Sequence, residues 1–117
     1  VFQDPNCGYC KRFERDMQKL DNVTIHMFLY PILGGDSPEK SRNIWCAKDK
    51  ARAWADWMLR DQLPAEANCD AGALARNVEF GRRYKVNGTP TTIFANGMRV
   101  PGAIPVAQVE KHLADAK

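Results

Sequence analysis

Two cysteines, Cys7 and Cys10, stand three positions apart near the start of the 117-residue chain, with Gly8 and Tyr9 between them. Cysteines with this spacing at the start of a helix can bring their Cβ atoms within disulfide reach, which is about 4 Å. The pair could therefore form a working redox couple, a permanent staple, or half of a zinc site. The elements around the pair discriminate between these chemistries.

Helical and strand patterns surround the cysteine pair. Apolar side chains at helical spacing share one stripe, so we expect a helix from about Gly8 to Leu20. Phe2 marks the end of a preceding strand, and the β-branched and aromatic run 23–30 predicts a short buried strand afterwards. Strand, helix and strand form a βαβ unit with a right-handed crossover. The stripe consists of Cys10, Phe13, Met17 and Leu20.

This setting favours a redox pair over a structural disulfide, because the motif opens a helix directly after a strand. A Cys7 thiolate would lie over the unpaired N–H groups of the helix, so its pKa should fall below the free value of about 8.5. Cys10 falls on the apolar stripe and should be shielded, which suits a resolving thiol. This assignment requires Cys7 to be accessible at the surface.

Zinc binding is disfavoured by the positions of the other candidate ligands. Cys46 and Cys69 are separated by 22 residues and form no second close pair, and His26 and His112 are isolated. Common structural zinc sites instead combine two close pairs of ligands. We therefore expect no metal and no cofactor.

We predict that Cys46 and Cys69 form a structural disulfide, with two free buried thiols as the alternative. Such a bond would stabilise the fold by about 3 kcal/mol through loop entropy. It would also indicate an oxidising compartment, either the periplasm or the outside of the cell.

The remaining sequence predicts more helices and a hairpin. Asp36 followed by Ser-Pro-Glu is typical of a capped helix start, and helical character continues with interruptions over about 37–86. Asn96-Gly97 between two β-rich runs predicts a hairpin with a type I′ turn. Pro105 can open a final helix. The predicted order is therefore βαβ, a helical insertion, then ββα.

The overall composition excludes other classes. Hydrophobic residues make up 44% of the chain and charged residues 26%, which is typical of a folded domain without a membrane span. The net charge of +3 arises from interleaved basic and acidic side chains, without the basic stripe that nucleic acid requires.

Three segments in order resemble the catalytic domain of the DsbC/DsbG family of bacterial periplasmic thiol:disulfide isomerases, within the thioredoxin superfamily. They are Cys7-Gly8-Tyr9-Cys10, the stretch 44–50 around Cys46, and Asn87-Gly88-Thr89-Pro90. The resemblance spans nearly all of the chain.

This resemblance implies an α/β thioredoxin-like fold with a central mixed four-stranded sheet, and a single catalytic domain over 1–117. It implies a cis Thr89–Pro90 bond whose loop packs against the motif and binds substrate, with Gly8 and Tyr9 tuning the active site. It further implies periplasmic localisation, misoxidised or unfolded protein clients, and a DsbD-like membrane reductase as partner. The family's N-terminal dimerisation domain is missing from this chain, so a homodimer is expected only for the full-length parent.

We therefore predict a thiol:disulfide isomerase or reductase that acts on exported proteins through Cys7 and Cys10. A DsbA-like oxidase is one alternative, because the sequence does not determine the reduction potential. A non-catalytic, client-binding chaperone module is the other.

One departure concerns a proton acceptor. Thioredoxin carries a buried acid six residues before its first active cysteine, where this chain has Val1. The nearest carboxylates in sequence are Asp4 and Glu14, and we expect both to be solvated.

Overall fold

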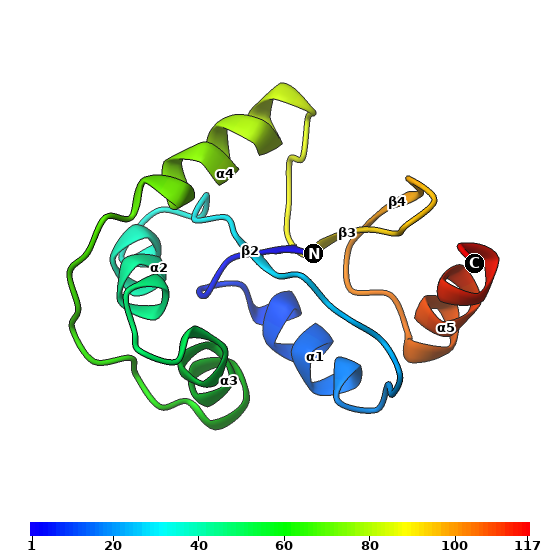
Figure 1. The fold of residues 1–117 in the computed structure, drawn as a ribbon, viewed down its shortest axis with the longest axis horizontal. Helices are drawn as coiled ribbons and strands as arrows, with labels where there is room; N and C mark the ends of the chain where they lie inside the picture. The colour runs from blue at the N-terminus through cyan, green and yellow to red at the C-terminus, as the bar shows by residue number, and fades with distance from the viewer.

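A mixed four-stranded sheet lies at the centre of the computed structural model, which describes residues 1–117 (Figure 1). The strand order is β2-β1-β3-β4; β1 is parallel to β2 and antiparallel to β3, which pairs antiparallel with β4. The predicted α/β class with a mixed four-stranded sheet is confirmed. The strands are β1 (Phe2–Gln3), β2 (Phe28–Leu29), β3 (Thr91–Ile93) and β4 (Arg99–Pro101).

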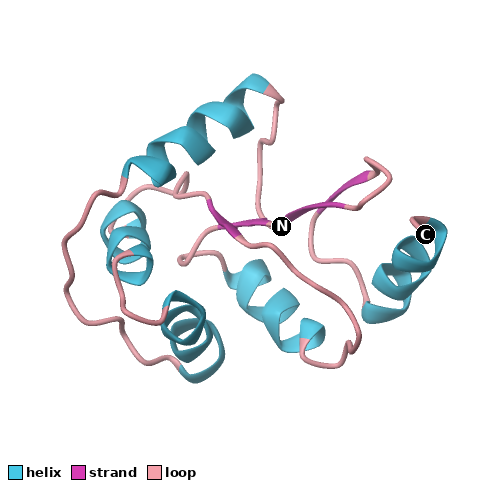
Figure 2. Cartoon of the chain, in the orientation of Figure 1, coloured by secondary structure: helices cyan, strands magenta, loops and turns pink.

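Five helices surround the sheet (Figure 2). Helices α1 and α5 lie on one side of the sheet and α4 on the other, while α3 packs against α1 and α2 packs against α3 (Figure 1). No helix has the length and apolar character needed to cross a membrane. The helices are α1 (Gly8–Met17), α2 (Ser37–Trp45), α3 (Lys50–Arg60), α4 (Gly72–Arg83) and α5 (Val106–Asp115).

Each side of the sheet has its own apolar cluster. Phe13 and Met17 of α1 pack with Phe94 and with Val109 of α5. On the α4 side, the cluster is formed by Phe2, Tyr30 and Val86. A third cluster joins Cys7 and Cys10 to α2, α3 and α4, and it consists of Cys7, Cys10, Leu29, Ile44, Trp54, Met58 and Leu74.

The packing of α4 against the sheet depends on Gly81. A Cβ atom at this position would collide with the ring of Tyr30, which is 1% exposed. The Tyr30 hydroxyl also donates to the carbonyl oxygen of Val86 at 2.7 Å, so the buried polar atom is satisfied. The missing side chain therefore allows the helix to approach the strand segment closely.

The prediction of a buried strand over 23–30 is wrong in length and in burial. Only Phe28–Leu29 forms a strand, and Ile25 and Phe28 are 41% and 44% exposed. The strand β2 lies at the edge of the sheet and pairs on one side only, with Phe28 opposite Phe2 and Leu29 opposite Gln3. Hydrophobic composition alone does not show which residues of a run are paired.

The hairpin between β3 and β4 is present, but its predicted type I′ turn is wrong. That turn requires positive φ at both central residues, whereas here Gly97 has φ +87° and Asn96 is not among the residues with positive φ. The Gly97 N–H donates to the Phe94 oxygen at 2.9 Å, and the Phe94 N–H donates to the Met98 oxygen at 2.9 Å. The connection is thus a three-residue loop that ends in a left-handed glycine.

Candidate active site at the start of helix α1

Cys7 occupies the N-cap position of α1, between the end of β1 and the first helical turn. Its backbone is extended (φ −92°, ψ 113°), and its Sγ accepts the backbone N–H of Cys10 at 3.1 Å. A side-chain acceptor at this position satisfies one of the N–H groups that a helix start leaves unpaired. The sulfur therefore lies where the helix backbone favours negative charge.

The pKa of the Cys7 thiol is lowered to about 6, mainly because the Cys10 thiol donates a hydrogen bond to it. The Thr89 side chain and the Cys10 backbone N–H also stabilise the thiolate, whereas burial and the Asp4 carboxylate oppose it. The same thiol hydrogen bond, together with burial, raises the pKa of Cys10 well above its ordinary value. At neutral pH the pair therefore consists of a Cys7 thiolate and a Cys10 thiol.

The expected exposure of Cys7 is wrong. Cys7 is only 5% exposed and Cys10 is 0% exposed, so both thiols are buried and both are free. Cys7 is covered because its Sγ lies over the helix start and contacts the Thr89 carbonyl oxygen at 3.4 Å. The neighbouring Gly8 and Tyr9 remain exposed, Tyr9 by 64%. This burial is the feature of the site that argues against attack on a client.

Thr89 and Pro90 approach the cysteine pair from the other end of the chain. The Thr89–Pro90 peptide bond is cis, and Cys7 Sγ in its thiol form donates to the Thr89 carbonyl. Thr89 is half-buried and its backbone makes no backbone hydrogen bond, whereas the Pro90 carbonyl accepts from the Gly102 N–H at 2.7 Å. The Thr89 carbonyl, which no other backbone group pairs with, therefore lies beside the sulfur.

Asp4 is fully buried, which contradicts the expectation that it is solvated. Its carboxylate accepts hydrogen bonds from the backbone N–H groups of Asn6, Ile32 and Leu33 at 2.8–3.0 Å and from the Ser37 hydroxyl at 2.6 Å. Four donors compensate the desolvation of the charge. The sequence signal for this role was the Asp-Pro-Asn turn directly after a strand, where an aspartate often binds the backbone two residues later.

Glu14 is half-buried, so its expected solvation is also wrong. Its carboxylate accepts from Gln3 Nε2 at 3.1 Å and from the Trp54 indole at 2.8 Å. The acid links β1, α1 and α3 rather than facing solvent.

The segment before Cys7 is also bonded to α2 and α3, which sequence analysis did not predict. Asn6 Nδ2 donates to Asp36 at 2.7 Å, and Lys40 Nζ donates to Asn6 Oδ1 at 2.9 Å. The Trp57 indole donates to the Pro5 carbonyl at 2.7 Å. Asp36 was expected to cap α2, but its side chain makes no capping hydrogen bond there because it binds Asn6 instead.

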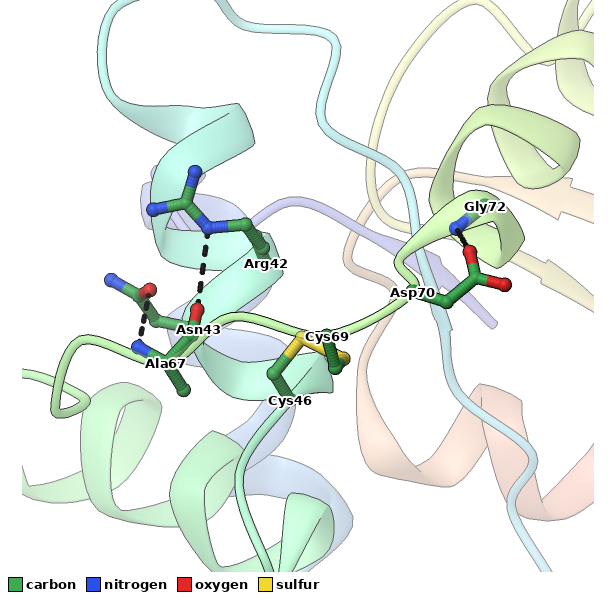
Figure 3. The surroundings of a disulfide bond; sticks show 7 residues. All are labelled: Arg42, Asn43, Cys46, Ala67, Cys69, Asp70 and Gly72. Carbon is green, nitrogen blue, oxygen red and sulfur yellow. Dashed lines mark hydrogen bonds between the residues drawn. A yellow bond between two sulfur atoms is a disulfide. The ribbon is translucent and has the colours of Figure 1, made fainter.

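Cys46 and Cys69 are joined by a disulfide with Cα atoms 5.5 Å apart (Figure 3). The bond connects the end of α2 to the segment that precedes α4. Two hydrogen bonds support the same connection: Arg42 Nε donates to the Ala67 oxygen at 3.3 Å, and the Ala67 N–H donates to Asn43 Oδ1 at 3.1 Å (Figure 3). This disulfide does not involve Cys7 or Cys10, which are both free.

The fold and this site define a thioredoxin-fold protein with a pair of free cysteines at the start of a helix. A family model for a thioredoxin-like domain matches residues 1–117. The chain is 37% identical to a disulfide interchange protein from Neisseria gonorrhoeae whose crystal structure superposes with a TM-score of 0.92, covering 99% of this chain and 84% of that one. The chain therefore belongs to the thioredoxin-like family, among its disulfide interchange proteins.

Curated relatives carry names of the same kind. A probable thiol:disulfide interchange protein DsbC of Bordetella parapertussis is 50% identical over 113 residues, which cover 97% of this chain and 40% of the relative. The thiol:disulfide interchange protein DsbC of Escherichia coli is 33% identical, over 97% of this chain and 49% of the relative. The chain thus spans less than half the length of these curated relatives.

Proposed function

We propose that Cys7 and Cys10 catalyse thiol–disulfide exchange that isomerises or reduces wrong disulfides in exported proteins. The observation that carries this proposal is the asymmetry of the pair: one thiol has a pKa of about 6 at a helix start, and its partner remains protonated. A thiolate is the nucleophile in this chemistry, and its rate of attack is greatest when its pKa lies near the ambient pH.

The first step is attack of the Cys7 thiolate on one sulfur of a client disulfide. A bond forms between Cys7 Sγ and that sulfur, the client disulfide breaks, and the second client sulfur leaves as a thiolate. The product is a mixed disulfide between protein and client. No external oxidant or reductant is needed for this step.

The mixed disulfide can then resolve in two ways. In isomerisation, another thiolate of the client attacks the client sulfur that is bonded to Cys7. A different client disulfide forms, and Cys7 leaves as a thiolate. In reduction, Cys10 loses its proton and attacks Cys7 Sγ, which forms the Cys7–Cys10 disulfide and releases the client thiolate. The second route oxidises the pair, so an external dithiol reductant must restore it before the next cycle.

Client binding involves the backbone of Thr89 next to Pro90. The amide and carbonyl of Thr89 have no backbone partner, and the carbonyl oxygen lies 3.4 Å from the sulfur, so an extended client segment can pair with this backbone regardless of its sequence. Approach of the client displaces the contact between Cys7 Sγ and the Thr89 carbonyl and uncovers the sulfur. Gly8 and Tyr9 tune the site, and the exposed Tyr9 offers the client an apolar surface.

The cellular setting is part of the same proposal. Residues 1–117 form one catalytic domain, with a helical insertion over about 37–86, of a longer homodimeric protein whose N-terminal domain dimerises. It works in the periplasm on unfolded or misoxidised clients, and a DsbD-like membrane reductase keeps the pair reduced. Family membership supports this setting, and the Cys46–Cys69 disulfide supports an oxidising compartment.

Trapping of mixed disulfides tests the proposal. A Cys10→Ser variant cannot resolve the intermediate internally, so it should accumulate covalent adducts with a scrambled-disulfide substrate such as misoxidised ribonuclease. Non-reducing gel electrophoresis and mass spectrometry would detect adducts attached at Cys7. The matched Cys7→Ser variant should form none and should reshuffle the substrate no faster than buffer thiols do. Absence of adducts with Cys10→Ser would leave a non-catalytic binding module as the better description.

The reduction potential separates an isomerase or reductase from an oxidase. Equilibration of the Cys7–Cys10 couple with glutathione measures it, ideally in the full-length parent. A strongly oxidising couple, near that of DsbA at about −120 mV, would make a disulfide donor the better assignment.

A further inference from the structure

The segment that leads into Cys7 is held by the helical insertion. Both polar atoms of the Asn6 side-chain amide are hydrogen-bonded: Lys40 Nζ donates to Oδ1 at 2.9 Å, and Nδ2 donates to Asp36 at 2.7 Å. Lys40 of α2 forms an ion pair at 3.3 Å with Asp36, the residue that precedes this helix. We call these three residues the Asn6 clamp.

Trp57 of α3 extends the contact between the insertion and the same segment. Its indole N–H donates to the Pro5 carbonyl at 2.7 Å, and Lys40 Nζ lies 4.3 Å from the centre of its ring. The side chain of Lys40 is only 16% exposed. A half-buried ammonium with a hydrogen bond, an ion pair and an aromatic face is held more firmly than a surface lysine.

The position of Asn6 matters because Cys7 follows it directly. Asn6 lies in the turn that the Cys7 N–H closes by donating to the Asp4 oxygen at 3.1 Å. The Cys7 sulfur can accept the Cys10 N–H only while this turn keeps Cys7 in the extended conformation of the helix cap. A loose Asn6 would let this segment sample other conformations, in which the sulfur leaves the helix start. The thiolate would then lose part of the hydrogen bonding that stabilises it.

We propose that Lys40 is a positioning residue for the cysteine pair: through Asn6 it holds Cys7 Sγ over the start of α1, so that the insertion sets the reactivity of the nucleophile. This inference rests on the proposed function and deepens it. Lys40 acts by geometry and not by its charge on the sulfur. The charged or titratable groups that influence Cys7 directly are Cys10 and Asp4.

The chain supplies a matched control in Lys11. Lys11 Nζ also lies over the Trp57 ring, at 4.0 Å, and it also forms an ion pair, with Asp61 at 2.9 Å. Its side chain is 24% exposed, close to the value for Lys40, but its Nζ makes no hydrogen bond to Asn6. Substituting either lysine by methionine therefore removes one positive charge from the same indole, and only one of the two substitutions breaks the clamp.

The test measures the Cys7 pKa by thiolate absorbance near 240 nm and by the pH dependence of iodoacetamide alkylation. Lys40→Met should raise this pKa by about half a unit, which lowers the alkylation rate at pH 5 about threefold. Lys11→Met should leave the pKa at the wild-type value, and Lys40→Arg, which retains a donor, should restore most of the shift. Wild-type behaviour of Lys40→Met, or an equal shift in Lys11→Met, would overturn the proposal.

A second substitution keeps the test independent of the folding of Lys40→Met. Asn6→Ala removes the other side of the clamp and keeps the Lys40 charge, so it should raise the Cys7 pKa by a similar amount. The double variant should show no further shift, because both changes break one interaction. Additive shifts would contradict the clamp. This test measures the Cys7 pKa and uses no client. A negative result would therefore contradict the Asn6 clamp alone, whereas a negative trapping experiment would contradict the proposed function.

Discussion

At the scale of single residues, hydrogen bonds control the cysteine pair more than exposure does. Cys7 and Cys10 are both buried, yet the pKa of one is lowered and that of the other is raised. The difference arises because Cys7 accepts from the Cys10 thiol and N–H, whereas Cys10 is a donor within the apolar cluster. The buried Asp4 opposes this trend, since its negative charge raises the pKa of Cys7.

The lowered pKa makes the stability of the reduced protein depend on pH. The folded pKa of Cys7 is about 6 and the unfolded value is about 8.5, so folding favours the thiolate. This stabilisation is fully present above pH 8.5 and is lost as the pH falls through 6. Between pH 6 and pH 8 the free energy of unfolding should therefore rise by about 2 kcal/mol more than in Cys7→Ser. Urea denaturation of both reduced proteins would measure it, and parallel pH profiles would contradict a folded-state thiolate.

At the scale of elements, the insertion helices α2 and α3 hold the active-site segment, and a disulfide holds the insertion. The Cys46–Cys69 bond and the two hydrogen bonds to Ala67 connect α2 to the segment before α4. Lys40 of α2 and Asp36, the residue just before this helix, bind Asn6. Helix α2 therefore connects the Cys46–Cys69 disulfide to the segment that precedes Cys7.

Removal of this disulfide should destabilise the protein. Replacing Cys46 and Cys69 by alanine, in a Cys7→Ser/Cys10→Ser background that prevents disulfide exchange, should lower the free energy of unfolding by about 3 kcal/mol. The cause is the greater entropy of the unfolded chain once the loop is open. Denaturant titration against the same background with the disulfide intact gives the difference. A loss below about 1 kcal/mol would show that loop entropy is not the source of the bond's contribution.

At the scale of the whole molecule, the insertion and the sheet share a hydrophobic core. Ile44, Trp54 and Met58 of the insertion pack in one cluster with Leu29 of β2 and with the two active-site cysteines. An insertion with a separate core could unfold by itself, whereas this one loses its core when the sheet region unfolds. The shared cluster predicts a single cooperative unit.

Tryptophan fluorescence tests this cooperativity, because the three tryptophans lie in α2 and α3: Trp45, Trp54 and Trp57. Fluorescence therefore reports on the insertion, while far-ultraviolet circular dichroism reports on all five helices. The two signals should show the same midpoint in urea. An earlier fluorescence midpoint would mean that the insertion unfolds before the sheet.

Local patterns in the sequence determined the order of elements, the helix after Cys7 and the buried side of that helix. These features depend on residues within a few positions of one another, so periodicity and turn residues encode them. The strand over 23–30 was not determined in this way, because a pattern in one segment does not show which of its residues pair with a neighbouring strand, here Phe28 and Leu29 with β1. The composition of a segment does not show which strand it pairs with.

Only the tertiary structure decided the environment of the cysteine pair. The residues that cover Cys7, bury Asp4 and hold Asn6 come from distant parts of the chain: Thr89 is 82 positions from Cys7, and Lys40 is 34 positions from Asn6. The types and spacing of Cys7 and Cys10 thus determined which chemistry is available. The helix start and Cys10, both close in sequence, also favour charge on Cys7 rather than on Cys10. Long-range contacts determined how deeply the sulfur lies, because burial exists only once the chain has folded.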